Sequence, residues 1–170
     1  MTIPSPAEYA PFYQGYIDHV DASNIQDALS EQLESMSAFL ETLTDEQASF
    51  RYAPDKWSVK EVLGHLSDTE RVMSYRALSI ARGDQHPLPS FDQNQYVAAA
   101  NFDDRSLASL IEEWKAVRNA SIAFFRHVAS PDDERSGTVN DHPMSVRALA
   151  YIVVGHTVHH RKILAERYHL

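Results

Sequence analysis

The sequence predicts an all-α fold: a four-helix bundle with an irregular N-terminal arm and long loops after the second and third helices. Three observations predict it. In four segments, apolar residues recur at steps of three and four, which places them on one face of a helix. Three of these segments follow Ser or Asp residues of the kind that cap helices. No segment shows a convincing alternation of polar and apolar residues, the pattern of a half-buried strand. We expect one helical-bundle domain over residues 1–170.

The N-terminal part of the chain is expected to form an arm and the first helix. About the first 20 residues are rich in Pro and Tyr, which favours an irregular arm. The first helix is expected at residues 24–43, and Thr44 to Gln47 resemble a capping box that opens a short helical turn. Residues 52–57 are expected to form a loop, because Pro54 disfavours helix in the residue before it. The apolar face of the first helix consists of Ile25, Leu29, Leu33, Met36, Leu40 and Leu43.

The second helix is expected at residues 59–82. Ser58 and Glu61 form a clearer capping box at its start, and Gly83 is a natural stop at its end. Residues 84–102 contain helix breakers and no convincing periodicity, so they predict a long loop. Such a loop can act as a crossover that brings the second and fourth helices side by side. The apolar face of the second helix consists of Val59, Val62, Leu63, Leu66, Met73, Ala77 and Ile80.

The third and fourth helices are expected at residues 104–129 and 146–168. Asp103 or Asp104 is the expected cap of the third helix, and Ser145 that of the fourth. The segment between them, from Pro131 to Pro143, is polar and turn-like. The apolar face of the third helix consists of Leu107, Leu110, Ile111, Trp114, Val117, Phe125 and Val128. That of the fourth consists of Val146, Leu149, Ala150, Val153, Leu164 and Tyr168.

The composition argues against several classes of function. The chain has 15 basic and 24 acidic residues, a net charge of −9 that would repel the phosphates of a nucleic acid. It has no Cys, which excludes disulfides, Cys-ligated zinc, iron–sulfur clusters and a Cys nucleophile. No apolar stretch approaches the roughly 18 residues of a membrane span, and the N-terminus does not resemble a signal peptide. We therefore expect a cytoplasmic protein that binds neither nucleic acid nor membrane.

The nine His residues are the most unusual feature of the composition. His156 and His160 are four residues apart, so they lie on one face of the fourth helix, the face that also carries the inward-facing Val153. His159 lies roughly 100° away from them, toward solvent or a flank. Two inward-facing imidazoles at this spacing can bind one cation. A neutral, hydrogen-bonded pair is the alternative.

His65 is the candidate third ligand, because it lies at the edge of the apolar stripe of the second helix. Asp68, one turn later, is a candidate to orient its imidazole from outside the ligand set, although a solvated Asp68 is the alternative. Glu61, one turn earlier, is better explained by the capping box. Gly64 and Gly155 interrupt their helices directly before a His, at a cost of about 1 kcal/mol each relative to Ala. Close approach of another element would explain both glycines, and tolerated drift is the alternative.

Several familiar catalytic motifs are missing. The chain has no His-Glu-x-x-His, no paired Glu-x-x-His, no Gly-x-Ser-x-Gly elbow and no Gly-rich phosphate loop. Three neutral His ligands would leave the 2+ charge of a metal undiminished, which favours a Lewis acid that acidifies a bound water or thiol. An open fourth position would indicate a catalytic rather than a structural site.

Two stretches of the chain resemble the DinB/YfiT-like family of metalloenzymes. The first runs from Lys56 to Glu70 and includes the Trp-Ser, Glu and Gly-His positions; the second runs from Gly155 to Arg161. Each is only moderately specific, but the two in this order are more so, and the likeness extends over about residues 8–168. The three metal-binding His of the family correspond to His65, His156 and His160 here.

The resemblance implies a four-helix bundle, often dimeric, that holds one divalent metal ion, with zinc and nickel the expected ions. Some members are thiol-dependent S-transferases that activate a low-molecular-weight thiol such as bacillithiol or mycothiol. The first interpretation is therefore a metal-dependent transferase that acts on such a thiol and a small-molecule substrate. A metal-dependent hydrolase that uses metal-bound hydroxide is the second, and a non-catalytic metal-binding or dimerisation module the third. Exposed aromatic residues in the arm and the mid-helix glycines also favour a homodimer.

Overall fold

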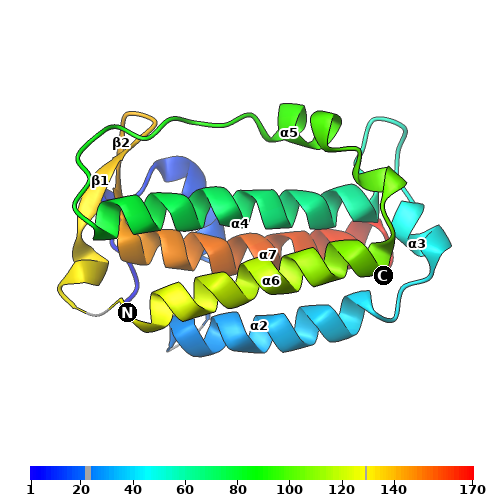
Figure 1. The fold of residues 1–170 in the computed structure, drawn as a ribbon, viewed down its shortest axis with the longest axis horizontal. Helices are drawn as coiled ribbons and strands as arrows, with labels where there is room; N and C mark the ends of the chain where they lie inside the picture. The colour runs from blue at the N-terminus through cyan, green and yellow to red at the C-terminus, as the bar shows by residue number, and fades with distance from the viewer. Residues whose placement is uncertain (22–23, 129) are drawn as a thin grey trace.

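The computed structural model describes residues 1–21, 24–128 and 130–170, and its four long helices confirm the predicted bundle (Figure 1). Each helix lies within the segment predicted for it. Ser58 and Ser145 cap their helices as predicted, since their hydroxyls accept the backbone N–H of the third helical residue. The third helix, however, begins later than expected and is capped by Ser106, not by Asp103 or Asp104. The four helices are α2 (Ile25–Leu40), α4 (Val59–Ala81), α6 (Leu107–Arg126) and α7 (Val146–Arg167).

The order of the helices around the bundle explains the long connection after α4. Both α4 and α2 pack against α6 and α7, so α4 and α2 lie diagonally opposite each other. Helices α4 and α6 run in the same direction, opposite to α2 and α7 (Figure 1). The chain must therefore return along the whole bundle between α4 and α6, and residues 82–106 do so. This is the predicted crossover, and it brings α4 and α7 side by side.

The two long loops contain more regular structure than expected. The connection after α4 includes a short helix, α5 (Gln93–Ala100), and a 3-10 turn, η3 (Phe102–Asp104). The segment predicted as turn-like holds a 3-10 turn, η4 (Asp132–Glu134), and an antiparallel hairpin of β1 (Ser136–Val139) and β2 (His142–Ser145). Strands of four residues are too short to give a readable alternation. Asn140 and Asp141, both at positive φ, form the two-residue turn between them, a conformation that Asn and Asp tolerate.

The N-terminal arm consists of short helical turns, where an irregular segment was expected. It contains η1 (Pro6–Glu8), η2 (Pro11–Tyr13) and α1 (Gln14–Ile17), and the predicted turn after α2 is α3 (Asp45–Ser49). Helix α1 packs on α7, and a Cβ added at Gly155 would lie 1.9 Å from the carbonyl oxygen of Tyr16. A Cβ at Gly64 would lie 2.4 Å from the ring of Phe102. Both glycines therefore permit the close approach of another element.

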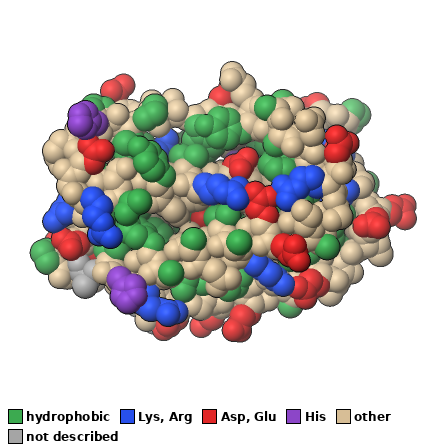
Figure 2. All heavy atoms as spheres, viewed as in Figure 1, with side chains coloured by type: hydrophobic (Ala, Val, Ile, Leu, Met, Phe, Trp, Pro, Cys, Tyr) green, Lys and Arg blue, Asp and Glu red, His purple; other side chains and the backbone are tan. Residues whose placement is uncertain are grey.

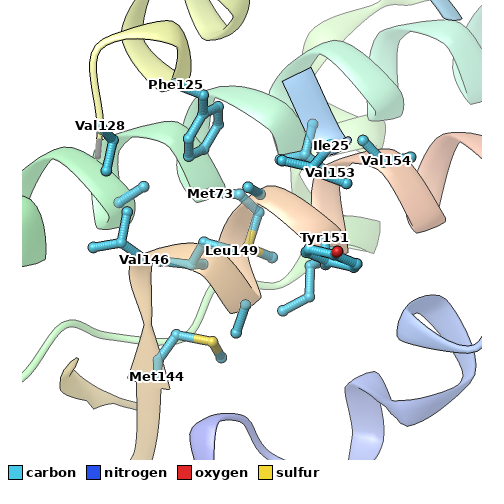
Figure 3. Packing of buried hydrophobic residues seen from close by; sticks show 14 of the residues in the cluster. Ile25, Met73, Phe125, Val128, Met144, Val146, Leu149, Tyr151, Val153 and Val154 are labelled. Atoms are coloured by element: carbon cyan, nitrogen blue, oxygen red, sulfur yellow. The ribbon is translucent and has the colours of Figure 1, made fainter. Parts of the chain in front are cut away.

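The apolar core consists of two clusters with a polar layer between them. One cluster joins the C-terminal halves of α4 and α6 to the N-terminal half of α7, with Met73, Phe125 and Leu149 among its members (Figure 3). The other lies at the opposite end and includes Leu63 and Trp114. The polar side chains between them come from all four long helices: the buried His65, Glu70, Arg118, His156, Thr157 and His160, and the half-buried Gln32.

The surface combines ion pairs with exposed apolar side chains. On the face shown in Figure 2, basic and acidic side chains lie next to one another. Glu113 of α6, for example, pairs with Arg71 of α4 at 2.7 Å and also with Arg105. Tyr75 and Leu78 of α4 are 57% and 42% exposed. Among the described helices, none combines the length and the hydropathy that a membrane span requires.

Candidate metal centre

The structure brings the three predicted His residues together in the polar layer. His65 projects from α4 toward α7, where His156 and His160 lie one turn apart on the same face. The Nε2 atom of His156 is 3.0 Å from Nε2 of His65 and 3.1 Å from Nε2 of His160. The three side chains are buried, and they form the group of potential metal ligands found among the described residues.

Hydrogen bonding alone does not satisfy this cluster. An imidazole nitrogen either donates one N–H or offers one lone pair in the ring plane. Nε2 of His156 therefore has one such position but two nitrogen neighbours, and Nδ1 of His160 is buried without a partner among the described residues. A cation that accepts the three Nε2 lone pairs would satisfy these three nitrogens, but not Nδ1 of His160. Ligands about 2.0–2.1 Å from a tetrahedral zinc ion lie about 3.3 Å apart, close to the separations observed here.

Burial keeps the three imidazoles in the neutral form that metal binding requires. It lowers the pKa of His65 to about 4 and holds the pKa values of His156 and His160 well below the usual value. The neighbouring imidazoles act in the same direction, because a second positive charge nearby is unfavourable. All three lone pairs are therefore available at neutral pH.

Thr69 is the neighbour that orients His65. Its Oγ1 atom lies 3.3 Å from Nδ1 of His65, four residues earlier on α4. Asp68, the expected partner, lies instead 3.3 Å from Arg71 and does not contact His65. Glu61 closes the capping box of α4, as expected, and also pairs with Arg51. The i, i+4 spacing that places His156 beside His160 also places Thr69 beside His65. Asp68, at i+3, was expected instead because a carboxylate is a common partner of a metal-binding His.

His159 lies outside the cluster, on the side that the helical phase predicts. Its ring stacks on His19, with centroids 6.1 Å apart, and contacts the edge of Tyr16 at 5.3 Å. Tyr16 also contacts the ring of His156 at 5.3 Å. The N-terminal arm thus covers α7 beside the three-His cluster.

A pocket of about 460 Å³ opens beside the cluster. His156 and Thr69 line one part of it, and Met73 and Arg76 continue its wall along α4. Its aromatic wall comes from the arm and the crossover: Phe12, Tyr13, Tyr16 and Phe91. Helical periodicity could not predict this wall, since its residues lie outside the four long helices.

A buried ion pair fixes the four helices behind the cluster. Arg118 of α6 is fully buried and donates to Glu70 of α4 through Nε and Nη2, both at 2.9 Å. Its remaining donors reach Gln32 of α2 at 2.8 Å and Thr157 of α7 at 2.9 Å. The charge of Arg118 is therefore neutralised within the bundle, and the network holds Thr157, the residue after His156.

Comparisons with known proteins agree with this fold. No curated protein is significantly similar in sequence to the chain. The solved structure of YfiT from Bacillus subtilis, described as a probable metal-dependent hydrolase with an unusual four-helix bundle topology, superposes with a TM-score of 0.72. The two share 19% sequence identity over 94% of this chain and 93% of the other, which shows a common fold. The model of the DinB superfamily matches residues 28–164, a range that includes all three His. The chain therefore belongs to the DinB superfamily.

Proposed function

We propose that this protein is a metal-dependent hydrolase with one divalent cation at His65, His156 and His160. The observation that carries the proposal is the convergence of three buried, neutral imidazoles beside a pocket. YfiT, the structural relative described as a probable metal-dependent hydrolase, supports it. Zinc and nickel are the ions we propose, since imidazole suits both.

A divalent cation, when bound by neutral ligands, supplies a Lewis acid that lowers the pKa of water and polarises a carbonyl or phosphoryl oxygen. The chain itself would contribute binding and orientation. Thr69 fixes the ring of His65, and the ion pair of Arg118 holds the segment around His156. The aromatic wall of Tyr16 and Phe91 would hold the apolar part of a substrate and exclude water.

Transfer to a low-molecular-weight thiol, the first interpretation of the sequence, would use the same ligands and pocket. The similarity to YfiT favours hydrolysis over thiol transfer, so we place hydrolysis first. The two reactions differ in their product, which contains the thiol only after transfer.

The test is a panel of esters, amides and phosphoesters incubated with zinc-loaded, nickel-loaded and chelator-treated protein, each with and without a small thiol. We expect turnover without thiol that requires metal, is lost in His156→Ala and persists in His159→Ala. No turnover of any substrate would contradict the proposal. Products that form only with the thiol, and contain it, would replace hydrolysis by transfer.

A further inference from the structure

Arg76 is a buried cation in the wall of the pocket, and its partners do not neutralise it. The residue is 2% exposed. Its Nη2 atom donates to the carbonyl oxygen of Pro89 at 2.6 Å, and Nη1 lies 3.5 Å from the sulfur of Met73. The guanidinium also lies 5.7 Å from the ring centre of Phe91. Among the described residues, no carboxylate forms an ion pair with it, although a guanidinium has five N–H donors.

Arg118, the other buried arginine among the described residues, shows what a purely structural role looks like in this bundle. Arg118 is paired with Glu70 through two nitrogens and uses its remaining donors on two further side chains. A buried charge without a counter-ion is costly, so Arg76 requires another explanation. Among the described residues that line this pocket, the one carboxylate is that of Asp92, which accepts the N–H groups of Asn94 and Gln95 at the start of α5 and forms no ion pair with Arg76.

The place of Arg76 relative to the metal ligands completes the argument. Arg76 is 11 residues after His65, so the two lie within about 20° of each other around α4. Thr69 and Met73 lie between them, and Thr69, Met73 and Arg76 all line the pocket that reaches His156. From Thr69 to Arg76 the helix rises by about 10 Å. The side chain bends back along α4, because its guanidinium contacts Met73 in the preceding turn.

We propose that Arg76 binds an oxyanion of the substrate, supplied by a carboxylate or a phosphate, at the end of the pocket away from the three His. Guanidinium groups bind both through paired, charge-assisted hydrogen bonds. The substrate is then an amphipathic acid: its anionic group lies at Arg76, its apolar body lies between Met73, Tyr16 and Phe91, and its reactive group lies at His156. This inference rests on the proposed function for the reactive end, but not for the binding of the anion.

The test uses metal-free protein, so that an anion cannot bind through a metal. Calorimetric titrations compare 3-phenylpropionate and phenyl phosphate with the neutral 3-phenylpropanamide, for wild type, Arg76→Gln, Arg76→Lys and Arg71→Gln. Arg71 is the matched control, because it lies on the same helix but is outside this pocket and paired with Glu113. Unfolding by urea and circular dichroism establish that each variant is folded.

We expect wild type and Arg71→Gln to bind at least one of the two anions about ten-fold more tightly than the amide. Arg76→Gln should lose that preference without losing affinity for the amide, and Arg76→Lys should keep part of it. The anion that binds more tightly identifies the substrate as a carboxylate or a phosphate. Equal binding of anion and amide by wild type, no anion binding at millimolar concentration, or an unchanged preference in a folded Arg76→Gln would overturn the inference. The proposed hydrolysis can be refuted separately. If the preference for the anion over the amide depends on Arg76 but no substrate of the panel is turned over, only the proposed function is contradicted.

Discussion

Gly155→Ala tests whether the arm is held against α7 as closely as the structure indicates. An added Cβ would lie 1.9, 2.6 and 3.0 Å from the carbonyl oxygen, carbonyl carbon and Cα of Tyr16. These are backbone atoms, so a side-chain rotation cannot relieve the overlap. We therefore place the overpacking cost at the upper end of the usual range, about 3 kcal/mol. Better helix propensity offsets about 1 kcal/mol of it. The expected net loss of stability is thus about 2 kcal/mol.

Urea unfolding measures this loss, and Gly15→Ala in α1 is the matched control. A Cβ at Gly15 has no neighbour within 4 Å, so that variant should be as stable as wild type or up to about 1 kcal/mol more stable. If α1 moves away to relieve the overlap, Tyr16 leaves His156, and the pocket wall opens as well. A Gly155→Ala protein at least as stable as wild type would refute the close approach of the arm.

The other predictions concern the buried ion pair, the His residues and assembly. Arg118→Met should destabilise the protein by about 3–5 kcal/mol in urea unfolding, because it leaves Glu70 buried without its partner; a change within error would mean that the carboxylate is not confined there. His159→Ala should retain the metal content of wild type, and its loss while His156→Ala retains metal would show that the helical phase is wrong. The metal-free protein should lose stability as pH falls from about 6.5 toward 4, since the unfolded chain takes up a proton at the ordinary pKa of His while folded His65 does so only near its pKa of about 4. For His65 alone the loss between pH 6.5 and 5 is about 1.5 kcal/mol, and equal urea midpoints at these two pH values would contradict it. Sedimentation should show a homodimer at micromolar concentration, and the exposed Tyr75 of α4 is one side chain that the partner copy can cover; a monomer alone would count against this.

The sequence predicts the long helices and the three-His cluster because both follow from helical periodicity and capping. The apolar faces and the capping Ser residues of α4 and α7 determine which side of each helix points inward. In α7 that side carries His156 and His160, while His159 lies outside. The mid-helix glycines indicate that other elements come close at Gly64 and Gly155, as the structure confirms. These features are local, so they can be derived without knowing the packing of the whole chain.

The remaining features depend on contacts between segments distant in sequence. Leu88 of the crossover helps to stabilise the hairpin. Its backbone N–H donates to the carbonyl oxygen of Thr138, and its carbonyl oxygen accepts the N–H of Asn140. Asp103 does not cap α6, because its carboxylate accepts the hydroxyl proton of Ser58 instead. Ser106 caps the helix in its place. The pocket wall and the burial of Arg76 likewise arise only when the arm and the crossover close over α4 and α7.

Metal analysis of a His→Ala series tests the central claim most directly. Wild type, His159→Ala and single Ala variants of His65, His156 and His160 are refolded or purified with zinc or nickel, dialysed and analysed for metal per chain, with circular dichroism to confirm folding. We predict about one equivalent in wild type and His159→Ala, and a large loss in each of the other three, because each removes one of three ligands. Stoichiometric metal in all three ligand variants would contradict the site.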